Sequence, residues 1–334
     1  MKKIIMTLLS GMLLAGTASA QDVIRLGIIG LDTSHSAAFT KLLNSDEDNP
    51  LVQKYEIVAA YPYGSRVIES SYKRIPKYIE EVKGYGVEVV DSIQEVLDKV
   101  DCVLLETNDG HPHLEQAAEI FKSGKPCFID KPLAATLGEV LALCELAKRY
   151  NVPVFSSSAL RFSKNTAAIR NGEYGKILGA DCYSPHHQEP THPDFGFYGI
   201  HGIESLFAVM GTGCKEVSRV HSEMGDVVTG AWEDGRMGTF RALTVKPSIY
   251  GGTAFTEKGT VAVGGYEGYF CLLEQVLKFF ETGVPPIEVE ETVEMFAFMK
   301  ASNMSLAKGG KTVTLEEAYK AGWKDAKKLL KQYK

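Results

Sequence analysis

Long runs of one charge are absent from this 334-residue sequence: no stretch of like-charged residues reaches five, and no basic stripe is visible. Proteins that bind nucleic acids or anionic membrane surfaces through their charge carry such clusters. Both kinds of partner are therefore excluded from the expected functions. A small molecule or another protein remains as the expected partner.

Cysteine motifs for metal or redox chemistry are also missing, because the six cysteines show no CxxC spacing. Cys102 and Cys127 lie within apolar strand-like runs, and Cys144 lies on an apolar helix face. These settings indicate buried thiols. An oxidising compartment permits disulfides, but a large core does not need them.

An apolar run long enough to span a membrane is lacking as well. Two lysines precede an apolar stretch, residues 4–15, which is followed by a small-residue cleavage signal at residues 18–20. The stretch is shorter than the ~20 residues that a spanning helix needs. Neither a twin-arginine motif nor a lipid-attachment cysteine accompanies it. We expect a cleaved signal peptide over residues 1–20, no membrane anchor, and a periplasmic or otherwise exported protein.

The remaining chain exceeds the size at which one core stops growing, ~250–300 residues, so two domains are expected. Without the leader, which holds two of the 36 basic residues, the net charge is −8, from 34 Lys and Arg against 42 Asp and Glu. From residue 21 to residue 155, apolar β-branched runs alternate with helical stretches. This alternation predicts a parallel sheet covered on both faces. Strands are expected at 24–29, 56–60, 87–90, 102–105, 127–129 and 152–155, and helices at 36–43, 114–122 and 138–150.

Residues 156–334 have a different pattern, in which apolar and polar residues alternate. This predicts a largely antiparallel sheet with one open face. The predicted fold class is therefore an α/β Rossmann domain followed by an α+β domain with an open-faced sheet. Strands are expected at 178–183, 216–221, 227–232, 238–245 and 259–263, and helices at 272–281 and 291–306.

The turn after the first strand carries only one of the three glycines of a dinucleotide-binding turn. Gly30 is in place, whereas the other two positions hold Asp32 and His35. A carboxylate at position 32 repels a diphosphate that the helix N-terminus would otherwise attract. One alternative is that Asp32, Thr33 or Ser34 caps the helix. The other is that Asp32 and His35 have a catalytic or ligand-binding role.

The end of the second strand lacks the acidic residue that usually holds the ribose of NAD. The sequence there ends in Gly64-Ser65-Arg66. Ser65 and Arg66 can instead hold a 2′-phosphate, which favours NADP. The alternative is an exposed loop arginine.

The segment from Gly124 to Ala134 contains Asp130-Lys131-Pro132. It resembles the Glu-Lys-Pro signature of the glucose–fructose oxidoreductase / inositol dehydrogenase / rhizopine catabolism (Gfo/Idh/MocA) family, with Asp130 where that family usually has Glu. The resemblance continues in order through essentially the whole mature chain. Its further matches are His113, Arg161-Phe162, residues 172–177, Gly199-Ile200-His201, residues 233–235 and residues 305–315.

The resemblance implies a Rossmann nucleotide-binding domain over residues 21–155 and a domain for substrate binding and oligomerisation over residues 156–334. It implies NAD(P)-dependent oxidation or reduction of a sugar or cyclitol. The expected partners are a small-molecule carbohydrate and a second copy of the chain, bound through the second-domain sheet. NADP or NAD is expected to contact Gly30, Leu31, Asp32, Ser65, Arg66, Asn108, His113, Asp130 and Lys131.

By the same resemblance, Lys131 lies between nicotinamide and substrate, and His201 accepts the proton. Where the family commonly has an Asp four residues before this histidine, the chain has Phe197. Glu204, one helical turn after His201, is expected to orient the imidazole. These residue types suit alcohol oxidation, which needs a base near the working pH and a cation beside the developing alkoxide. A surface Lys131 and a core His201 are the alternatives.

A proline-bearing loop carries three histidines and two acids, whose residue types could ligate zinc or another divalent ion. Their spacing matches no standard site, and a polar substrate-binding loop is the default interpretation. We therefore assign His186, His187 and His192, together with Arg161, to substrate binding and assign no metal ligands. The two acids are Glu189 and Asp194.

Three functions remain open. The leading hypothesis is an exported NAD(P)-type sugar oxidoreductase with His201 as base and Lys131 as electrostatic stabiliser. The second is a sugar lyase, hydratase or isomerase on the same scaffold without redox cofactor turnover. The third is a non-catalytic carbohydrate-binding protein. Lys131 and His201 favour the first two, whereas the missing turn glycines favour the last two.

Overall fold

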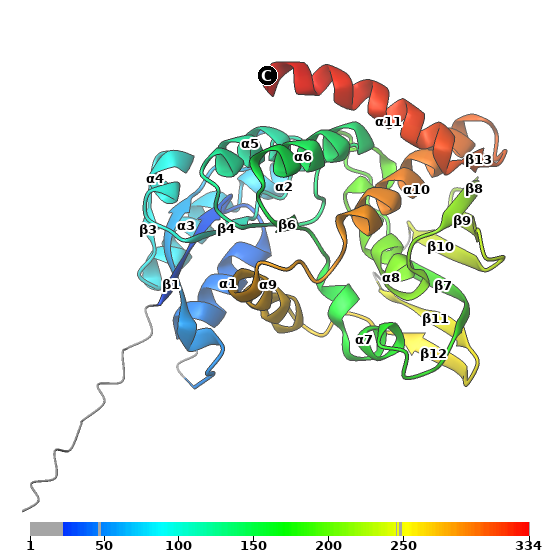
Figure 1. The fold of residues 1–334 in the computed structure, drawn as a ribbon, viewed down its shortest axis with the longest axis horizontal. Coiled ribbons are helices and arrows are strands. Elements are labelled where there is room, and N and C mark those ends of the chain that lie inside the picture. The colour runs from blue at the N-terminus through cyan, green and yellow to red at the C-terminus, as the bar shows by residue number, and fades with distance from the viewer. Residues whose placement is uncertain (1–22, 46–47, 245, 247–248, 334) are drawn as a thin grey trace, which may run out of the picture.

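A computed structural model of the chain describes residues 23–45, 48–244, 246 and 249–333. The expected signal peptide, residues 1–20, lies outside these residues. Two sheets with their packed helices lie side by side, the first on the left of Figure 1 and the second on the right. This arrangement leaves the ends of the first sheet's strands facing the second half of the chain.

The first sheet has six strands in the order β3-β2-β1-β4-β5-β6, and every pair in it is parallel. This order is that of a doubly wound dinucleotide-binding sheet, in which the chain reverses its direction of winding beside β1. The strands are β1 (Ile24–Ile29), β2 (Tyr55–Tyr61), β3 (Glu88–Val89), β4 (Cys102–Leu105), β5 (Cys127–Ile129) and β6 (Val154–Phe155).

Alternate residues of these strands enter two separate cores. On β4, for example, Val103 and Leu105 pack on one face, and Cys102 and Leu104 pack on the other. Both faces are buried, which explains why the strands read as continuous apolar runs. The helices on the two faces are α1 (Ser34–Ser45), α2 (Glu69–Tyr72), α3 (Ile75–Gly84), α4 (Ile93–Leu97), α5 (His113–Lys122) and α6 (Leu137–Tyr150).

The second sheet has seven strands in the order β12-β11-β7-β10-β9-β8-β13. Within the described strands of this second sheet, β10 and β7 form the only parallel pair, and all other neighbours are antiparallel. The expected strand over 238–245 ends at residue 243, and Val245 lies outside the described residues. The strands are β7 (Ile177–Pro185), β8 (Cys214–Ser222), β9 (Gly225–Trp232), β10 (Met237–Leu243), β11 (Gly251–Thr256), β12 (Gly259–Val263) and β13 (Val313–Thr314).

Helices from the second half of the chain return to the first sheet. The apolar face of α9 packs into the same core as β1 and α1, and α11 packs against α6. Figure 1 shows α9 beside α1 and α11 above α6. A boundary at residue 156 therefore separates the two sheets but not all of their helices. The helices are α7 (Lys164–Arg170), α8 (Ile200–Met210), α9 (Phe270–Thr282), α10 (Val289–Ala307) and α11 (Leu315–Leu329).

The predicted fold class, a Rossmann domain followed by an α+β domain with a largely antiparallel sheet, is confirmed. All six cysteines are free thiols, and four of them are buried. Within the described ranges no helix combines the length and apolarity that crossing a membrane requires.

Candidate functional site

A polar pocket of about 500 Å³ opens where the carboxyl ends of the first sheet's strands meet the second half of the chain. Doubly wound sheets bind their ligands at this position. The first domain contributes His35, Asn108 and Lys131 to the wall, and the second half contributes His187 and His201. Aromatic side chains complete the wall, namely Phe197, Tyr198, Tyr250, Tyr266 and Tyr269.

Lys131 enters this pocket from the turn that follows β5. The turn has a cis peptide bond between Lys131 and Pro132, and the carboxyl group of Asp130 before it is fully buried. Nζ of Lys131 lies 3.9 Å from Oδ2 of Asp130. Burial disfavours the Asp130 carboxylate, but the neighbouring His35 and Lys131 lower its pKa to about 2. A fixed cation therefore faces the pocket from the first domain.

His201 enters the same pocket from the first turn of α8. Nδ1 of His201 lies 2.8 Å from Oγ of Ser158, and the edge of the ring contacts Tyr250. Burial, followed by the positive charge of Lys131, lowers the pKa of His201 well below its ordinary value. The imidazole is therefore neutral at physiological pH, as a proton acceptor must be.

Glu204 lies one turn after His201 but bonds to Ser158 and Arg161. It accepts hydrogen bonds from the Ser158 backbone N–H at 2.8 Å and from Nε of Arg161 at 2.9 Å. The expected direct contact with the imidazole is absent among these bonds. Glu204 instead positions Ser158, which contacts the imidazole.

Arg161 was assigned to substrate binding, and the structure places it elsewhere. Its side chain is 1% exposed and forms ion pairs with Glu204 and Glu291. Both partners are buried acids, so the guanidinium serves as their charge compensation. Its bonds to these two acids leave Arg161 outside the pocket wall.

Asp32 fills the corner between the ends of β1, β2 and β4. Its carboxylate accepts the backbone N–H of Ser65 at 2.6 Å and that of Asn108 at 3.0 Å. Burial raises the pKa of Asp32 to about 6, against the effect of these two bonds. The turn requires a glycine at Gly30, since it has φ +95° and a Cβ there would lie 2.6 Å from the Thr107 nitrogen, whereas its contact with a cofactor stays a prediction.

The other residues assigned to the cofactor divide into three groups. Asn108 lines the pocket. Leu31 is in the core and His113 is buried, its ring 2.7 Å from the Thr107 carbonyl oxygen. Ser65 is buried and its hydroxyl donates to Asp109, whereas Arg66 is exposed. The Ser65 hydroxyl is thus already engaged by Asp109, whereas binding of a 2′-phosphate by Arg66 stays a prediction.

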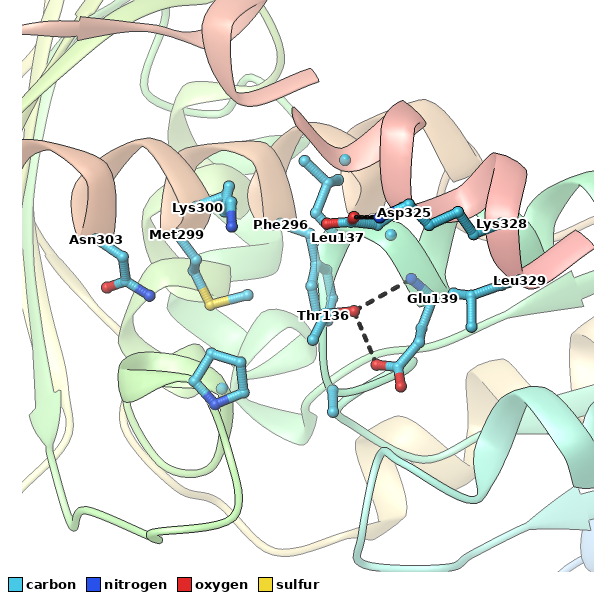
Figure 2. A pocket seen from close by; sticks show the side chains of 15 residues that line it. Thr136, Leu137, Glu139, Phe296, Met299, Lys300, Asn303, Asp325, Lys328 and Leu329 are labelled. Carbon is cyan, nitrogen blue, oxygen red and sulfur yellow. Dashed lines mark hydrogen bonds and ion pairs between the residues drawn. The ribbon is translucent and has the colours of Figure 1, made fainter. Parts of the chain in front are cut away.

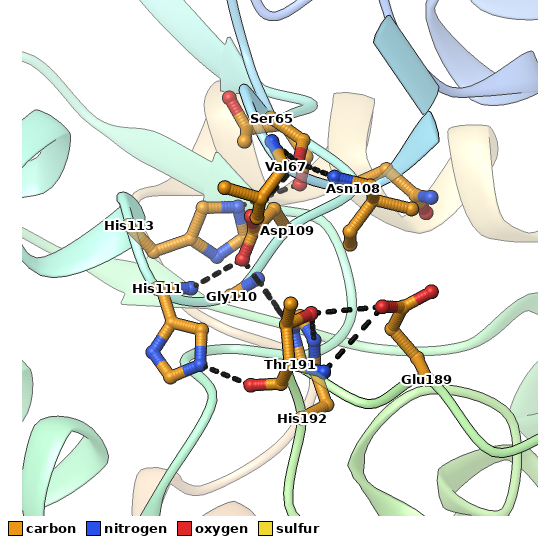
Figure 3. A network of polar contacts seen from close by, with 12 residues as sticks. Ser65, Val67, Asn108, Asp109, Gly110, His111, His113, Glu189, Thr191 and His192 are labelled. Atoms are coloured by element: carbon orange, nitrogen blue, oxygen red, sulfur yellow. Dashed lines mark hydrogen bonds and ion pairs between the residues drawn. The ribbon is translucent and has the colours of Figure 1, made fainter. Parts of the chain in front are cut away.

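Of the three histidines that the loop carries, His187 lies in the pocket wall, together with its neighbours Gln188 and Glu189. His186 is buried with its Nε2 3.0 Å from Asp194, so the assignment of His186 to substrate binding is not supported. His192 accepts the Gly110 backbone N–H at 3.2 Å and lies 3.5 Å from Asp109. Figure 3 shows His192 and Thr191 of this loop beside His111 and Asp109 of the first domain. The loop therefore ties the two halves of the chain together near the pocket.

A second cavity of about 370 Å³ lies between α6, α10 and α11 (Figure 2). Its wall includes Leu137, Phe296 and Met299. Thr136, which caps α6 through the backbone N–H of Glu139, lies at its edge. None of the residues assigned to a site from the sequence lines this cavity.

Sequence reasoning missed two residues that the structure brings to the first site. Ser158 carried no motif, and only its contact with His201 reveals it. Glu106, which the sequence analysis did not single out, follows the strand at 102–105, and its carboxyl group is fully buried near Asp130 and His35. An acid directly after a buried strand was the one signal available, because strand ends in such sheets meet at the ligand site.

The fold and this pocket define a two-domain protein of the dinucleotide-binding class. Residues 24–158 match the family model GFO_IDH_MocA, described as "Oxidoreductase family, NAD-binding Rossmann fold". The Rossmann domain of this chain therefore belongs to the Gfo/Idh/MocA oxidoreductase family, an NAD-binding family, as the sequence motifs indicated. No curated protein matches the chain.

Solved structures share the fold over most of the chain. A probable dehydrogenase from Thermotoga maritima is 20% identical, with a TM-score of 0.71 over 88% of this chain and 100% of its own. The scyllo-inositol dehydrogenase from Lactobacillus casei, solved with NAD(H) and scyllo-inositol, is 16% identical, with a TM-score of 0.69 over 88% and 100%. The myo-inositol dehydrogenase from the same organism, solved with NAD(H) and myo-inositol, is 15% identical, with a TM-score of 0.67 over 87% and 96%.

Proposed function

We propose that the protein is an exported oxidoreductase that acts on a sugar or a related polyol. The observation that carries this proposal is the pairing of a neutral imidazole, His201, with a cation, Lys131, across one polar pocket. Base and cation are the two groups that oxidation of an alcohol requires. The aromatic wall suits the apolar faces of a sugar ring, and the inositol dehydrogenases of similar fold support a polyhydroxylated substrate.

In the proposed mechanism, His201 takes the hydroxyl proton of the substrate at Nε2. This requires the tautomer in which Nδ1–H donates to Oγ of Ser158, a contact of 2.8 Å. Glu204 accepts the Ser158 N–H at 2.8 Å and so keeps Ser158 in place. Lys131 stabilises the negative charge that develops on the substrate oxygen. A bound nicotinamide would supply the hydride acceptor.

The fit of a dinucleotide depends on Asp32. The carboxylate occupies the donors of Ser65 and Asn108 at the corner above β1, where the diphosphate lies in dinucleotide-binding sheets. A diphosphate that enters there has to displace an acid of this chain. This single observation favours the second candidate function, elimination, hydration or isomerisation of a sugar in the same pocket without a redox cofactor.

The experiment that separates these candidates is a cofactor assay on correctly exported, purified protein. We expect mass spectrometry after denaturation to find a nicotinamide dinucleotide, and incubation with candidate polyols to change its absorbance. Lys131→Ala and His201→Ala are expected each to remove turnover, with the double variant no worse, because both act on one transition state. Absence of nicotinamide together with turnover of a sugar lost in both variants would instead establish the second function.

We further propose that the protein is exported and that it forms a homo-oligomer. Cleavage after Ala20 is expected, and N-terminal sequencing of the secreted protein should start at Gln21.

The open face of the second sheet supports a homo-oligomer, since Met237 and Phe255 flank Gly179 there and are 58% and 39% exposed. Light scattering of wild type and Met237→Glu tests this: a monomer in both cases contradicts it.

A further inference from the structure

A cluster of one histidine and two acids lies behind the wall of the pocket. His35 comes from the first turn of α1, Glu106 follows β4, and Asp130 follows β5. One nitrogen or oxygen of each residue lies within 4.8 Å of those of the other two. All three side chains are buried, and His35 also lines the pocket. The cluster therefore borders the place where a substrate would bind.

The polar atoms of this cluster lack the hydrogen bonds that buried groups need. In the part of the chain that the structure describes, neither carboxylate oxygen of Glu106 has a hydrogen-bond partner, and Oδ2 of Asp130 has none either. Nδ1 of His35 lies 2.9 Å from Oδ1 of Asp130, yet its geometry is not that of a hydrogen bond. Nearly all buried polar atoms are partnered in folded proteins, so three such groups at one point indicate a ligand.

The charges of the cluster indicate a cation. Glu106 and Asp130 together can carry two negative charges, and Lys131, with Nζ 3.9 Å from Oδ2 of Asp130, compensates one of them. Lys131 also acts on Glu106, so its one positive charge is shared by the two carboxylates, and the buried Asp32 adds a further acid nearby. A divalent ion would supply the missing positive charge.

The distances suit a metal ion. Nδ1 of His35 is 2.9 Å from Asp130 and 3.9 Å from Oε2 of Glu106. Ligands bound at ~2.0–2.2 Å lie roughly 3–3.5 Å apart, so side-chain shifts of about 1 Å bring all three atoms onto one ion. One imidazole and two carboxylates form a donor set for Zn²⁺ or Mn²⁺, because a soft thiolate is missing and an imidazole disfavours Ca²⁺ and Mg²⁺.

We propose that His35, Glu106 and Asp130 bind a divalent transition-metal ion of the Zn²⁺ or Mn²⁺ type at the inner wall of the pocket. This inference departs from the sequence analysis, which assigned no metal ligands and saw the only candidate in the loop from His186 to Asp194. An ion held here by three protein ligands keeps free coordination positions, as catalytic metal sites do. It would polarise an oxygen of the pocket ligand beside Lys131 and His201.

Metal binding to the full mature protein tests the proposal. The purified protein is stripped with a chelator and then titrated with Zn²⁺ alone and with Mn²⁺ alone by calorimetry. We expect one ion per chain for at least one of the two metals. Glu106→Gln and His35→Gln should each weaken metal binding at least about 100-fold. Mutation of a residue that only hydrogen-bonds to a metal ligand already lowers metal affinity by about 10- to 100-fold, so loss of a ligand itself should cost at least as much.

Matched controls come from the same pocket wall. Glu189→Gln and His187→Gln remove an acid and an imidazole that lie outside the cluster, and both should bind metal as the wild type does. Stoichiometric binding that persists in Glu106→Gln and His35→Gln, or no binding by the wild type, overturns the proposal. Circular dichroism checks the fold of each variant, and Asp130→Asn replaces any that does not fold.

A spectroscopic measurement on the wild type does not depend on any variant. Co²⁺ in place of the native ion should give visible d–d bands without the thiolate charge-transfer band that a cysteine ligand would produce. No uptake of Co²⁺, or a thiolate band, contradicts the ligand set. Neither measurement uses nicotinamide or substrate, so the metal proposal and the oxidoreductase proposal can fail independently.

Discussion

Oγ of Ser158 lies 2.8 Å from Nδ1 of His201, within hydrogen-bond distance of the imidazole. Glu204, which the helical spacing suggested as the partner of this imidazole, holds the Ser158 backbone instead. A serine two residues before the segment Leu160-Arg161 therefore decides the orientation of a histidine more than 40 residues later in the chain.

Replacement of this serine should change the histidine without changing the fold. Ser158→Ala is expected to reduce turnover by about tenfold, because Nδ1 of His201 loses the partner that selects its tautomer. This loss is a fraction of the ~10²–10⁴-fold rate increase that a general base contributes. Imidazole ¹⁵N chemical shifts should show a mixture of tautomers in the variant. Ser157→Ala is the matched control, since Ser157 bonds to Glu204 and not to His201. Equal effects of the two substitutions would show that the serine acts only through Glu204.

Asp32, in the turn between β1 and α1, should control the affinity for a dinucleotide. Asp32→Gly is expected to tighten the binding of NADH or NADPH about tenfold, because it removes an acid from the diphosphate corner, where one charge contact is worth on the order of 1 kcal/mol. With a pKa of about 6, Asp32 is ionised at pH 7.5 and largely neutral at pH 5. Wild-type affinity should therefore rise as the pH falls through 6, and the variant should lose this dependence. Fluorescence titration at both pH values measures it, and equal affinities at pH 7.5 would place the diphosphate elsewhere.

The buried arginine should support stability and not substrate binding. Arg161→Met removes the cation that Glu204 and Glu291 share; Glu291 keeps its ion pair with Arg170, but the buried Glu204 loses its cation, which typically costs about 3–5 kcal/mol of unfolding free energy. Urea denaturation measures this loss. Arg66→Met removes an exposed arginine and should change stability by less than about 0.5 kcal/mol. A stable Arg161→Met protein with weakened sugar binding would restore the assignment made from the sequence.

The link between the loop and the first domain should depend on pH. Nδ1 of His111 lies 3.3 Å from Glu139, and its Nε2 lies 2.7 Å from the Thr191 carbonyl oxygen, so both ring nitrogens face acceptors. The bond to Glu139 is the largest of the effects that raise the pKa of His111 to about 9. Because the pKa of His111 is higher in the folded than in the unfolded protein, where it is about 6.5, protonated His111 stabilises the fold. This stabilisation is complete below pH about 6.5 and disappears as the pH rises through about 9.

Thermal unfolding of His111→Gln against wild type measures that contribution. We expect the wild type to have the higher Tm at pH 6 and the two proteins to converge near pH 10. Glu139→Gln should move the point of convergence to lower pH. A difference in Tm that is constant from pH 6 to pH 10 would mean that His111 is not protonated in the folded protein.

Much of the fold was predictable because its signals are local. The strands at 102–105, 127–129 and 259–263 have the predicted bounds, since apolar runs between turn residues are read directly from the sequence. β11, with its two leading glycines, and α11 were not predicted. Strand β11 forms because it pairs with β7 and β12, and α11 covers α6, so tertiary contacts stabilise both.

The sequence by itself determined the family of the first domain, the Rossmann topology, the candidate base and the candidate cation, because these follow from local motifs and from the alternation of strands and helices. Only the tertiary structure decided what surrounds them. It placed Arg161 between two acids, put Asp32 against the N–H groups of Ser65 and Asn108, and gathered one residue of a helix and two residues from the ends of separate strands into one cluster. The reason is that burial, charge compensation and hydrogen bonding depend on contacts between residues far apart in the chain, and no local pattern records these contacts.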